Sequence, residues 1–226
     1  MKCIDYNPLQ TPNYGMIEAS RYLHIPHSTL QFWTSGTDPI VSLAARGKRP
    51  LLSFKNLVEC YVVQGMRSVH GISAHRIRVA ARWMRKNLAA SINPLADFDI
   101  TTDGMNLFLD IDGTLVTISR DGQLAMKPIF EAHLQRIERD ERGVAQRLFP
   151  YKSKNHLRTP KDSPRVIMID PMVSFGRPIL KDSGILSSVL ASRYKAGDSI
   201  AVLARSYGRK ESEIREAVEW EAGSAA

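Results

Sequence analysis

Apolar side chains near the amino terminus recur at helical spacing, with one break in the middle. Within residues 13–35, Leu23, Leu30 and Trp33 follow this spacing, and Pro26 interrupts it. Proline lacks a backbone donor and has a fixed φ, so it fits the first turn of a helix. The pattern predicts two short helices around a tight turn, which is the arrangement of a helix-turn-helix.

Glycine and proline punctuate the next stretch, residues 36–50, and two short apolar runs accompany them. The runs are Ile40-Val41 and Leu51-Leu52, and the turn signals between them predict a hairpin-like wing. Its tip would carry the basic residues Arg46, Lys48 and Arg49.

Helical spacing resumes after the predicted wing. Ser53 and Ser73 are suitable N-caps, because a serine hydroxyl accepts from the free N–H groups of a first helical turn. We therefore expect helices over residues 53–69 and 73–88. The second helix has an apolar stripe, with Arg78, Arg82 and Arg85 lying away from it.

Beyond residue 93 the sequence changes to short β-type runs. Three Asp-Gly pairs separate these runs, and Asp-Gly is a strong signal for a tight hairpin turn. The spacing predicts a small antiparallel meander, followed by a helix over residues 127–139. The pairs are Asp103-Gly104, Asp112-Gly113 and Asp121-Gly122.

A polar stretch rich in lysine, arginine and proline, residues 152–164, has the composition of a linker. Three helical patterns follow it, after a short β-type run that begins at Val166. They cover residues 185–195, 198–207 and 210–221, and Asp198 is the expected N-cap of the second.

These elements predict a mainly α protein with a small β connector. Its 226 residues, 43% of them apolar, suffice for two small folded units. The expected organisation is a winged helix-turn-helix domain over 1–92, a β-rich connector with a helix over 93–151, the linker over 152–164, and a trihelical module over 165–226.

Charge adds a class of partner to this picture. The chain has 31 lysines and arginines against 23 acidic residues, a net charge of +8. Between residues 46 and 86 there are ten basic residues and a single acidic one, Glu59. Such a dense concentration of positive charge suits binding to a phosphate backbone. The excess favours an anionic partner without selecting one kind.

No apolar run approaches the ~20 residues of a membrane span, and the amino terminus lacks the apolar core of a signal peptide. We therefore expect a cytoplasmic protein with no membrane partner. Cys3 and Cys60 lack paired spacing, which indicates free thiols, and the six histidines form no ligand set. We expect neither a metal nor a cofactor.

The second predicted helix has the composition of a recognition helix, which presents short polar and amide side chains to base edges. Leu30 and Trp33 would hold it from behind. The cations of the wing would bind phosphates, and those from Arg76 to Lys86 would either bind phosphates or only form a solvated helix face. The alternative is that both helices serve only as scaffold. The candidates for DNA contact are Ser28, Thr29, Gln31 and Thr34 on the helix and Arg46, Lys48 and Arg49 on the wing.

This region resembles the DNA-binding head of MerR-type regulators over residues 14–70. The similarity lies in Glu18-Ala19-Ser20, Leu23, Pro26 and the run from Ser28 to Trp33. It implies a winged helix-turn-helix. Gln31 stands where MerR heads commonly carry a basic residue, so the contact expected at that position is missing or changed.

The carboxy-terminal unit resembles the domain-of-unknown-function 433 family, a homeodomain-like trihelical module. The shared features are Ile169-Asp170-Pro171, Gly176-Arg177-Pro178-Ile179-Leu180, Ala196-Gly197-Asp198-Ser199-Ile200, the break at Tyr207-Gly208, and Ile214 to Ala217. The run from Lys181 to Gly184 departs from the Gly-Thr-Arg turn common there. With the MerR-like head, the chain from Tyr14 to Glu221 is similar to VapB-type antitoxins that pair this module with a PIN-domain ribonuclease toxin.

That resemblance implies an antitoxin of a type II toxin-antitoxin system, which dimerises, masks its toxin and represses its own operon by binding operator DNA. The basic part of this linker, from Lys152 to Lys161, is our first hypothesis for the toxin contact. The alternative is a stand-alone MerR-like transcription regulator, whose connector and final module sense a ligand.

The last module allows two interpretations. Its polar side chains would form a second nucleic-acid surface, or its helices would pair with a second copy of the chain. We favour a homodimer, because Ile214, Val218 and Trp220 leave apolar area that a unit this small would bury against another chain. The candidate surface consists of Arg205, Arg209, Lys210, Ser212 and Arg215.

One segment suggests an enzyme. The run from Asp110 to Val116 resembles the nucleophile motif of haloacid-dehalogenase-type phosphatases, in which the first aspartate attacks phosphorus and the second is the general acid and base beside magnesium. Those enzymes need a βαβ alternation downstream, which this sequence lacks. An Asp-Gly hairpin turn explains the same residues, so we expect no enzymatic activity.

Overall fold

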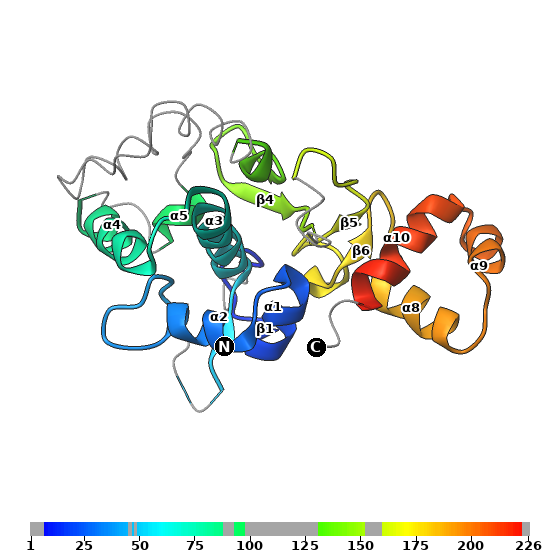
Figure 1. Cartoon of the computed structure of the whole chain (residues 1–226), viewed down its shortest axis with the longest axis horizontal. Helices are drawn as coiled ribbons and strands as arrows, with labels where there is room; N and C mark the ends of the chain where they lie inside the picture. Colours follow the sequence, from blue (N-terminus) through cyan, green and yellow to red (C-terminus); the bar gives the residue numbers. More distant parts are fainter. Residues whose placement is uncertain are drawn as a thin grey trace, which may run out of the picture.

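The computed structural model describes residues 7–44, 47, 49–87, 93–97, 131–151 and 160–222 (Figure 1). Within these ranges the chain is mainly helical, with three small antiparallel strand pairs. The predicted meander, the phosphatase-like run and the wing residues Arg46 and Lys48 lie outside the described residues.

The two short helices predicted at the amino terminus are confirmed. Strand β1 (Tyr14–Gly15) leads into α1 (Met16–Leu23), and α2 (His27–Thr34) begins directly after Pro26. His24 ends α1 in the left-handed conformation, with φ of 52°, and this reverses the chain within a few residues. The inward face of α2 carries Leu30 and Trp33, which are buried as expected.

The strand pairing expected for the wing is wrong. Leu51–Leu52 forms β2, but it pairs with β1 and not with Ile40-Val41. Ile40 and Val41 are completely buried, and the Val41 N–H donates to the Trp33 carbonyl at 3.0 Å. The apolar run that suggested a strand therefore fills the core behind α2.

Helices α3 (Phe54–His70) and α4 (Ala74–Asn87) occupy the predicted positions. The Ser53 hydroxyl accepts from the Asn56 N–H and the Asn56 side chain accepts from the Ser53 N–H, which is a reciprocal cap. The Ser73 hydroxyl accepts from the Arg76 N–H in the same way. Cys60 is a buried free thiol, as predicted, and Cys3 lies outside the described residues.

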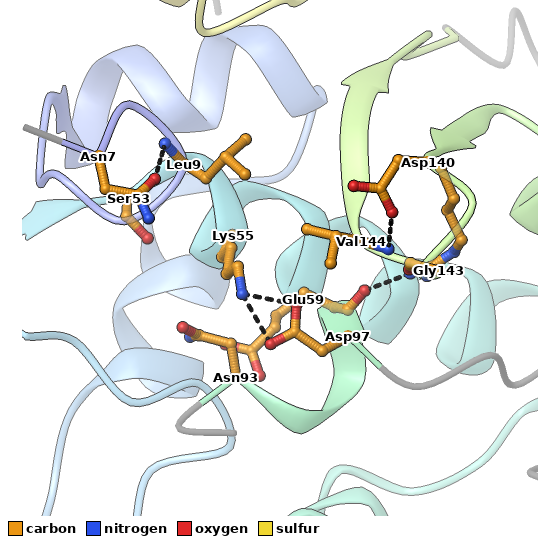
Figure 2. Close-up of polar contacts among 12 residues, drawn as sticks. Asn7, Leu9, Ser53, Lys55, Glu59, Asn93, Asp97, Asp140, Gly143 and Val144 are labelled. Atoms are coloured by element: carbon orange, nitrogen blue, oxygen red, sulfur yellow. Dashed lines mark hydrogen bonds and ion pairs between the residues drawn. The ribbon is translucent and has the colours of Figure 1, made fainter. Parts of the chain in front are cut away.

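The helix predicted over 127–139 ends by Leu134 in the described part of the chain. Ile137–Arg139 is strand β3, which pairs with β4 (Ala145–Leu148) as a hairpin. Asp140 closes the turn, because its carboxylate accepts from the Val144 N–H at 2.9 Å (Figure 2). The residues expected to form the end of a helix therefore form the first strand of a hairpin, which an Asx turn at Asp140 closes.

The carboxy-terminal part contains the three predicted helices behind a small strand pair. Strands β5 (Ile167–Met168) and β6 (Ile179–Leu180) flank the short helix η2 (Ser174–Gly176). The Ser199 hydroxyl caps the second long helix by accepting from the Val202 N–H, whereas Asp198, the predicted cap, forms an ion pair with Arg193. The long helices are α8 (Ser187–Lys195), α9 (Ile200–Tyr207) and α10 (Glu211–Ala222).

One hydrophobic cluster joins the amino- and carboxy-terminal parts. The His24 ring packs edge-on against Trp220 at 5.0 Å between centroids, and the Arg21 guanidinium lies 3.3 Å from the Glu221 carboxylate. Ile214 and Trp220 are therefore buried inside the chain. This removes the reason for expecting the carboxy-terminal helices to pair with a second copy.

A polar cluster is buried where the short helix α5 (Pro94–Asp97) packs on α3. Glu59 is completely buried, and one of its oxygens accepts from the Asn93 side chain at 2.8 Å and from the Asn56 side chain at 3.3 Å. Beside it, the Lys55 ammonium lies 2.8 Å from the Asp97 carboxylate (Figure 2). Burial raises the pKa of Glu59 to about 7, against the two amide hydrogen bonds that lower it.

This carboxyl should make stability depend on pH. Folded Glu59 holds its proton to about pH 7, whereas the unfolded chain releases it near its ordinary pKa of 4.5. The stabilisation is therefore complete below pH 4.5 and is lost as the pH rises through 7, by up to about 1.4 kcal/mol per pH unit. We expect Glu59→Gln to remove most of this fall between pH 5 and 8.

Urea unfolding of both proteins at pH 5, 6, 7 and 8 measures the effect, with the exposed Glu211→Gln as the control that should keep the wild-type slope. Parallel pH profiles for the wild type and Glu59→Gln would contradict the expectation.

Candidate nucleic-acid interface

The solvent-facing side of α2 matches the predicted recognition face in part. Ser28 and Gln31 are exposed and Thr29 is half-buried, while Leu30 and Trp33 attach the opposite side to the core. Helix α2 has no side-chain cap and no acidic residue in its first turn. The positive end of its dipole is therefore not neutralised from within the helix, which suits an anionic ligand.

Thr34 does not belong to this face. Its side chain is only 5% exposed, and its hydroxyl donates to the Leu30 carbonyl at 2.9 Å. Four residues after Leu30, it falls on the same inward side of the helix. Among the predicted DNA contacts on α2, Thr34 is therefore the least accessible.

Two residues not predicted for the interface lie beside the predicted ones. Phe32 is 54% exposed on α2, and Arg67 is exposed near the end of α3. Together with Ser28, Thr29 and Trp33 they line an open hollow of about 220 Å³. The helical spacing already placed Phe32 away from Leu30 and Trp33, but only the fold brings Arg67 to it.

A second hollow, of about 410 Å³, is lined in part by Gln31 and Thr34 of α2. Met16 of α1 and Gly47 and Pro50 of the segment before β2 contribute to its walls. Arg49, the described cation of the predicted wing tip, is exposed in this segment. Gln31 thus lines the second hollow, and Arg49 is the neighbour in sequence of its wall residue Pro50.

The basic face of α4 is largely used within the chain. Arg82 forms an ion pair with Asp38, and the Arg85 guanidinium donates to the carbonyls of Pro39 at 2.7 Å and Ile40 at 3.0 Å. The hydrogen bond from Arg82 holds the pKa of Asp38 below its ordinary value. These two cations fix the loop behind α2, which corrects the expectation that they bind phosphates.

Arg78 has a different role on the same helix. Its guanidinium lies 5.1 Å from the centre of the Phe32 ring, a distance at which a cation is attracted to the ring face. The contact places a positive charge directly over the exposed side of α2.

The second candidate surface, on α9 and α10, is less uniform than predicted. Arg209 is half-buried, and its guanidinium donates to the Lys181 carbonyl at 2.9 Å and to Glu213 at 2.7 Å. It therefore holds the module together and is not a free cation. Arg205, Lys210, Ser212 and Arg215 are exposed.

Among the helices that the structure describes, none has the length and apolar character needed to cross a membrane. Within the same residues, no three histidine, cysteine or acidic side chains are grouped as metal ligands would be.

Comparison with known proteins finds one relative by sequence and one similar solved structure. No protein-family model matches the chain. It is 27% identical over 236 aligned residues to the protein named "Putative antitoxin VapB45" of Mycobacterium tuberculosis, covering 92% of this chain and 93% of that protein. The crystal structure of Rv2018 from Mycobacterium tuberculosis has a similar fold, with a TM-score of 0.71 and 25% identity over 92% of this chain and 98% of that one. The chain is thus similar over nearly its whole length to a protein named as an antitoxin of the VapB type.

Proposed function

We propose that this protein is the antitoxin of a type II toxin-antitoxin system, acting in the cytoplasm and without enzymatic activity of its own. The observation that carries the proposal is the similarity to the VapB45 protein, which extends across both chains nearly end to end. In this role the protein neutralises a PIN-domain ribonuclease toxin and represses its own operon as a homodimer on operator DNA.

The exposed face of α2 supports the DNA-binding part. Ser28 and Gln31 offer hydroxyl and amide groups of the kind that read base edges, and Arg67 and Arg78 supply charge nearby. The order β1, α1, α2, β2 with an exposed Arg49 before β2 is compatible with a winged helix-turn-helix of the MerR type. In the dimer, this face of each copy would meet one half-site.

Co-purification from the native host tests the toxin part. The tagged full-length chain is isolated, the proteins that accompany it are identified by mass spectrometry, and ribonuclease activity of the partner is measured with and without the chain. A PIN-domain protein in stoichiometric amount whose activity the chain suppresses would establish the antitoxin. A chain that binds its own promoter but is isolated alone would favour the stand-alone regulator.

Two substitutions should separate base reading from phosphate binding. We expect Gln31→Ala to change the sequence preference, at a cost of about 1–3 kcal/mol on the preferred site if the amide reads a base. Arg49→Ala should weaken binding to all duplexes alike and reduce the salt dependence by about one phosphate contact. Fluorescence anisotropy with the promoter and with unrelated DNA at several salt concentrations measures both.

Lys195→Ala is the control for these variants, because Lys195 is an exposed cation on α8. Unchanged binding by both Gln31→Ala and Arg49→Ala would remove α2 and the segment before β2 from the DNA interface.

A further inference from the structure

Phe32 is a large apolar side chain in the middle of the face that α2 turns to solvent. It is 54% exposed, whereas its neighbour Trp33 is 2% exposed and attaches the helix to the core. Ser28 and Ser35, four residues before it and three residues after it, are exposed as well, so the three side chains share one face of the helix. The face that offers polar groups to bases thus also offers an aromatic ring.

The neighbouring helices hold this ring in place. The Arg78 guanidinium of α4 lies 5.1 Å from the centre of the Phe32 ring, where a cation is attracted to the ring face. The ring also lines the hollow of about 220 Å³ to which Arg67 of α3 contributes. A side chain that is already held loses less conformational freedom when it binds, so these contacts favour a role in recognition.

The elements around Phe32 carry more positive than negative charge. Helix α2 contains no acidic residue, and the one acidic residue of α3 and α4 together is Glu59, which is completely buried. The loop between α2 and β2 adds one acid, Asp38, which forms an ion pair with Arg82. This single carboxylate is shared among three arginines of α4, which are Arg82, Arg85 and Arg78. Such a charge balance suits a nucleic acid, which presents phosphates on both sides of each base edge.

An apolar side chain has one counterpart among the base edges of the major groove. Every base pair presents hydrogen-bond donors and acceptors there, and thymine alone adds a methyl group. A phenyl ring can neither donate to nor accept from the polar groups, but it packs well on a methyl group. It also has no hydroxyl with which to bind a phosphate. An exposed phenylalanine on a recognition helix is therefore suited to thymine.

We propose that Phe32 is a specificity-determining residue of the DNA interface and that its ring reads the methyl group of a thymine in the major groove. Arg78 holds the ring and, with Arg67, binds the flanking phosphates. The inference rests on the proposed DNA-binding function and adds to it a base that the operator must contain. In the homodimer each copy contacts one such thymine, so the operator contains two of them in symmetry-related positions.

Replacement of thymine by deoxyuridine tests the inference, because uracil forms the same base pair and lacks only the methyl group. Footprinting first locates the site of the full-length protein on a duplex of its own promoter. Each thymine of the site is then replaced in turn, and the dissociation constant is measured by fluorescence anisotropy at one salt concentration. We expect one thymine in each half-site at which replacement weakens binding about fourfold, the loss expected for one buried methyl group.

Three variants assign this effect to the ring. Phe32→Ala should weaken binding to the thymine duplex at least about fourfold and remove the difference between thymine and uracil at these positions. Phe32→Leu keeps an apolar side chain and should keep most of the difference. Tyr194→Ala is the matched control, because Tyr194 is an aromatic residue of α8 that is 46% exposed, and it should keep the full difference.

Equal affinity of the wild type for thymine and uracil at every position would overturn the inference while leaving the proposed DNA binding intact. This comparison needs no variant, so it is decisive whether or not Phe32→Ala folds. A preference for thymine that persists undiminished in Phe32→Ala would also overturn the inference. A wild-type protein that does not bind its promoter would contradict the proposed DNA-binding function, and this inference with it.

Discussion

Replacing Arg136 with methionine is expected to lower the free energy of unfolding by about 4 kcal/mol, more than most single substitutions. The guanidinium is buried, with the residue only 1% exposed, and it donates to backbone carbonyls rather than to an acid. Methionine of similar length would leave those carbonyls buried without a donor, at about 1–3 kcal/mol each where water cannot replace it. The acceptors are the carbonyls of Phe149 at 2.7 Å, Pro150 at 3.4 Å, Pro160 at 3.0 Å, Ser163 at 2.9 Å and Pro164 at 3.2 Å.

Two further variants separate this network from charge alone. Arg136→Lys keeps a cation but lacks the planar fork, so it should recover only a small part of the lost stability. Arg165→Met removes an arginine whose exposed side chain donates to the Gln135 carbonyl at 2.9 Å, and it should cost under about 1 kcal/mol. Urea unfolding measures the free energy of unfolding of all three variants. Equal losses for Arg136→Met and Arg165→Met would show that the buried hydrogen bonds of Arg136 stabilise the fold no more than the single exposed one of Arg165.

Arg136 also bears on the proposed toxin contact. The carbonyls it binds lie on both sides of residues 152–159, so Pro150 and Pro160 are drawn toward one guanidinium. Burial lowers the pKa of Arg136, yet a guanidinium keeps its proton at neutral pH. The described residues on either side of 152–159 are therefore held by one guanidinium.

Local patterns predicted the helices well and the strand pairs poorly. The serine caps and the spacing of Leu57 and Tyr61, or of Ile77 and Met84, are properties of neighbouring residues, so α3 and α4 could be placed from the sequence. The pairing of Leu51–Leu52 with Tyr14–Gly15 joins segments far apart in the chain, and no local signal specifies it. The burial of Arg136 could not be predicted from the sequence, because an arginine ordinarily lies on a solvated face.

In the candidate interface, too, features set by neighbouring residues could be predicted and features set by distant residues could not. Exposure of Ser28 and Gln31 follows from the positions of Leu30 and Trp33 on one helix, so the sequence sufficed. The roles of Arg82 and Arg85 depend on Asp38 and on the carbonyls of a loop more than forty residues away, which composition cannot reveal. Clustered cations in the sequence therefore overstated the charge available to DNA.

The second large effect is expected at Gly176, where alanine should lower the free energy of unfolding by about 4 kcal/mol. A methyl group there would overlap the Tyr14 hydroxyl oxygen and would lie 2.8 Å from the ring carbon that bears it. Tyr14 is 2% exposed, so the ring cannot yield without disturbing the core between the amino- and carboxy-terminal parts. The left-handed φ of 71° adds about 1–2 kcal/mol for any residue with a Cβ.

Gly208→Ala is the matched control for this substitution. Gly208 ends α9 with a similar φ of 62°, but nothing lies within 4 Å of an added methyl group, so only the backbone cost of about 1–2 kcal/mol should appear. The difference between the two variants in urea unfolding isolates the clash with Tyr14. In a Tyr14→Leu background, which removes the hydroxyl and the carbon that bears it, the effect of Gly176→Ala should fall toward that of Gly208→Ala. An undiminished effect would mean that the backbone of the turn, and not its contact with Tyr14, requires glycine at this position.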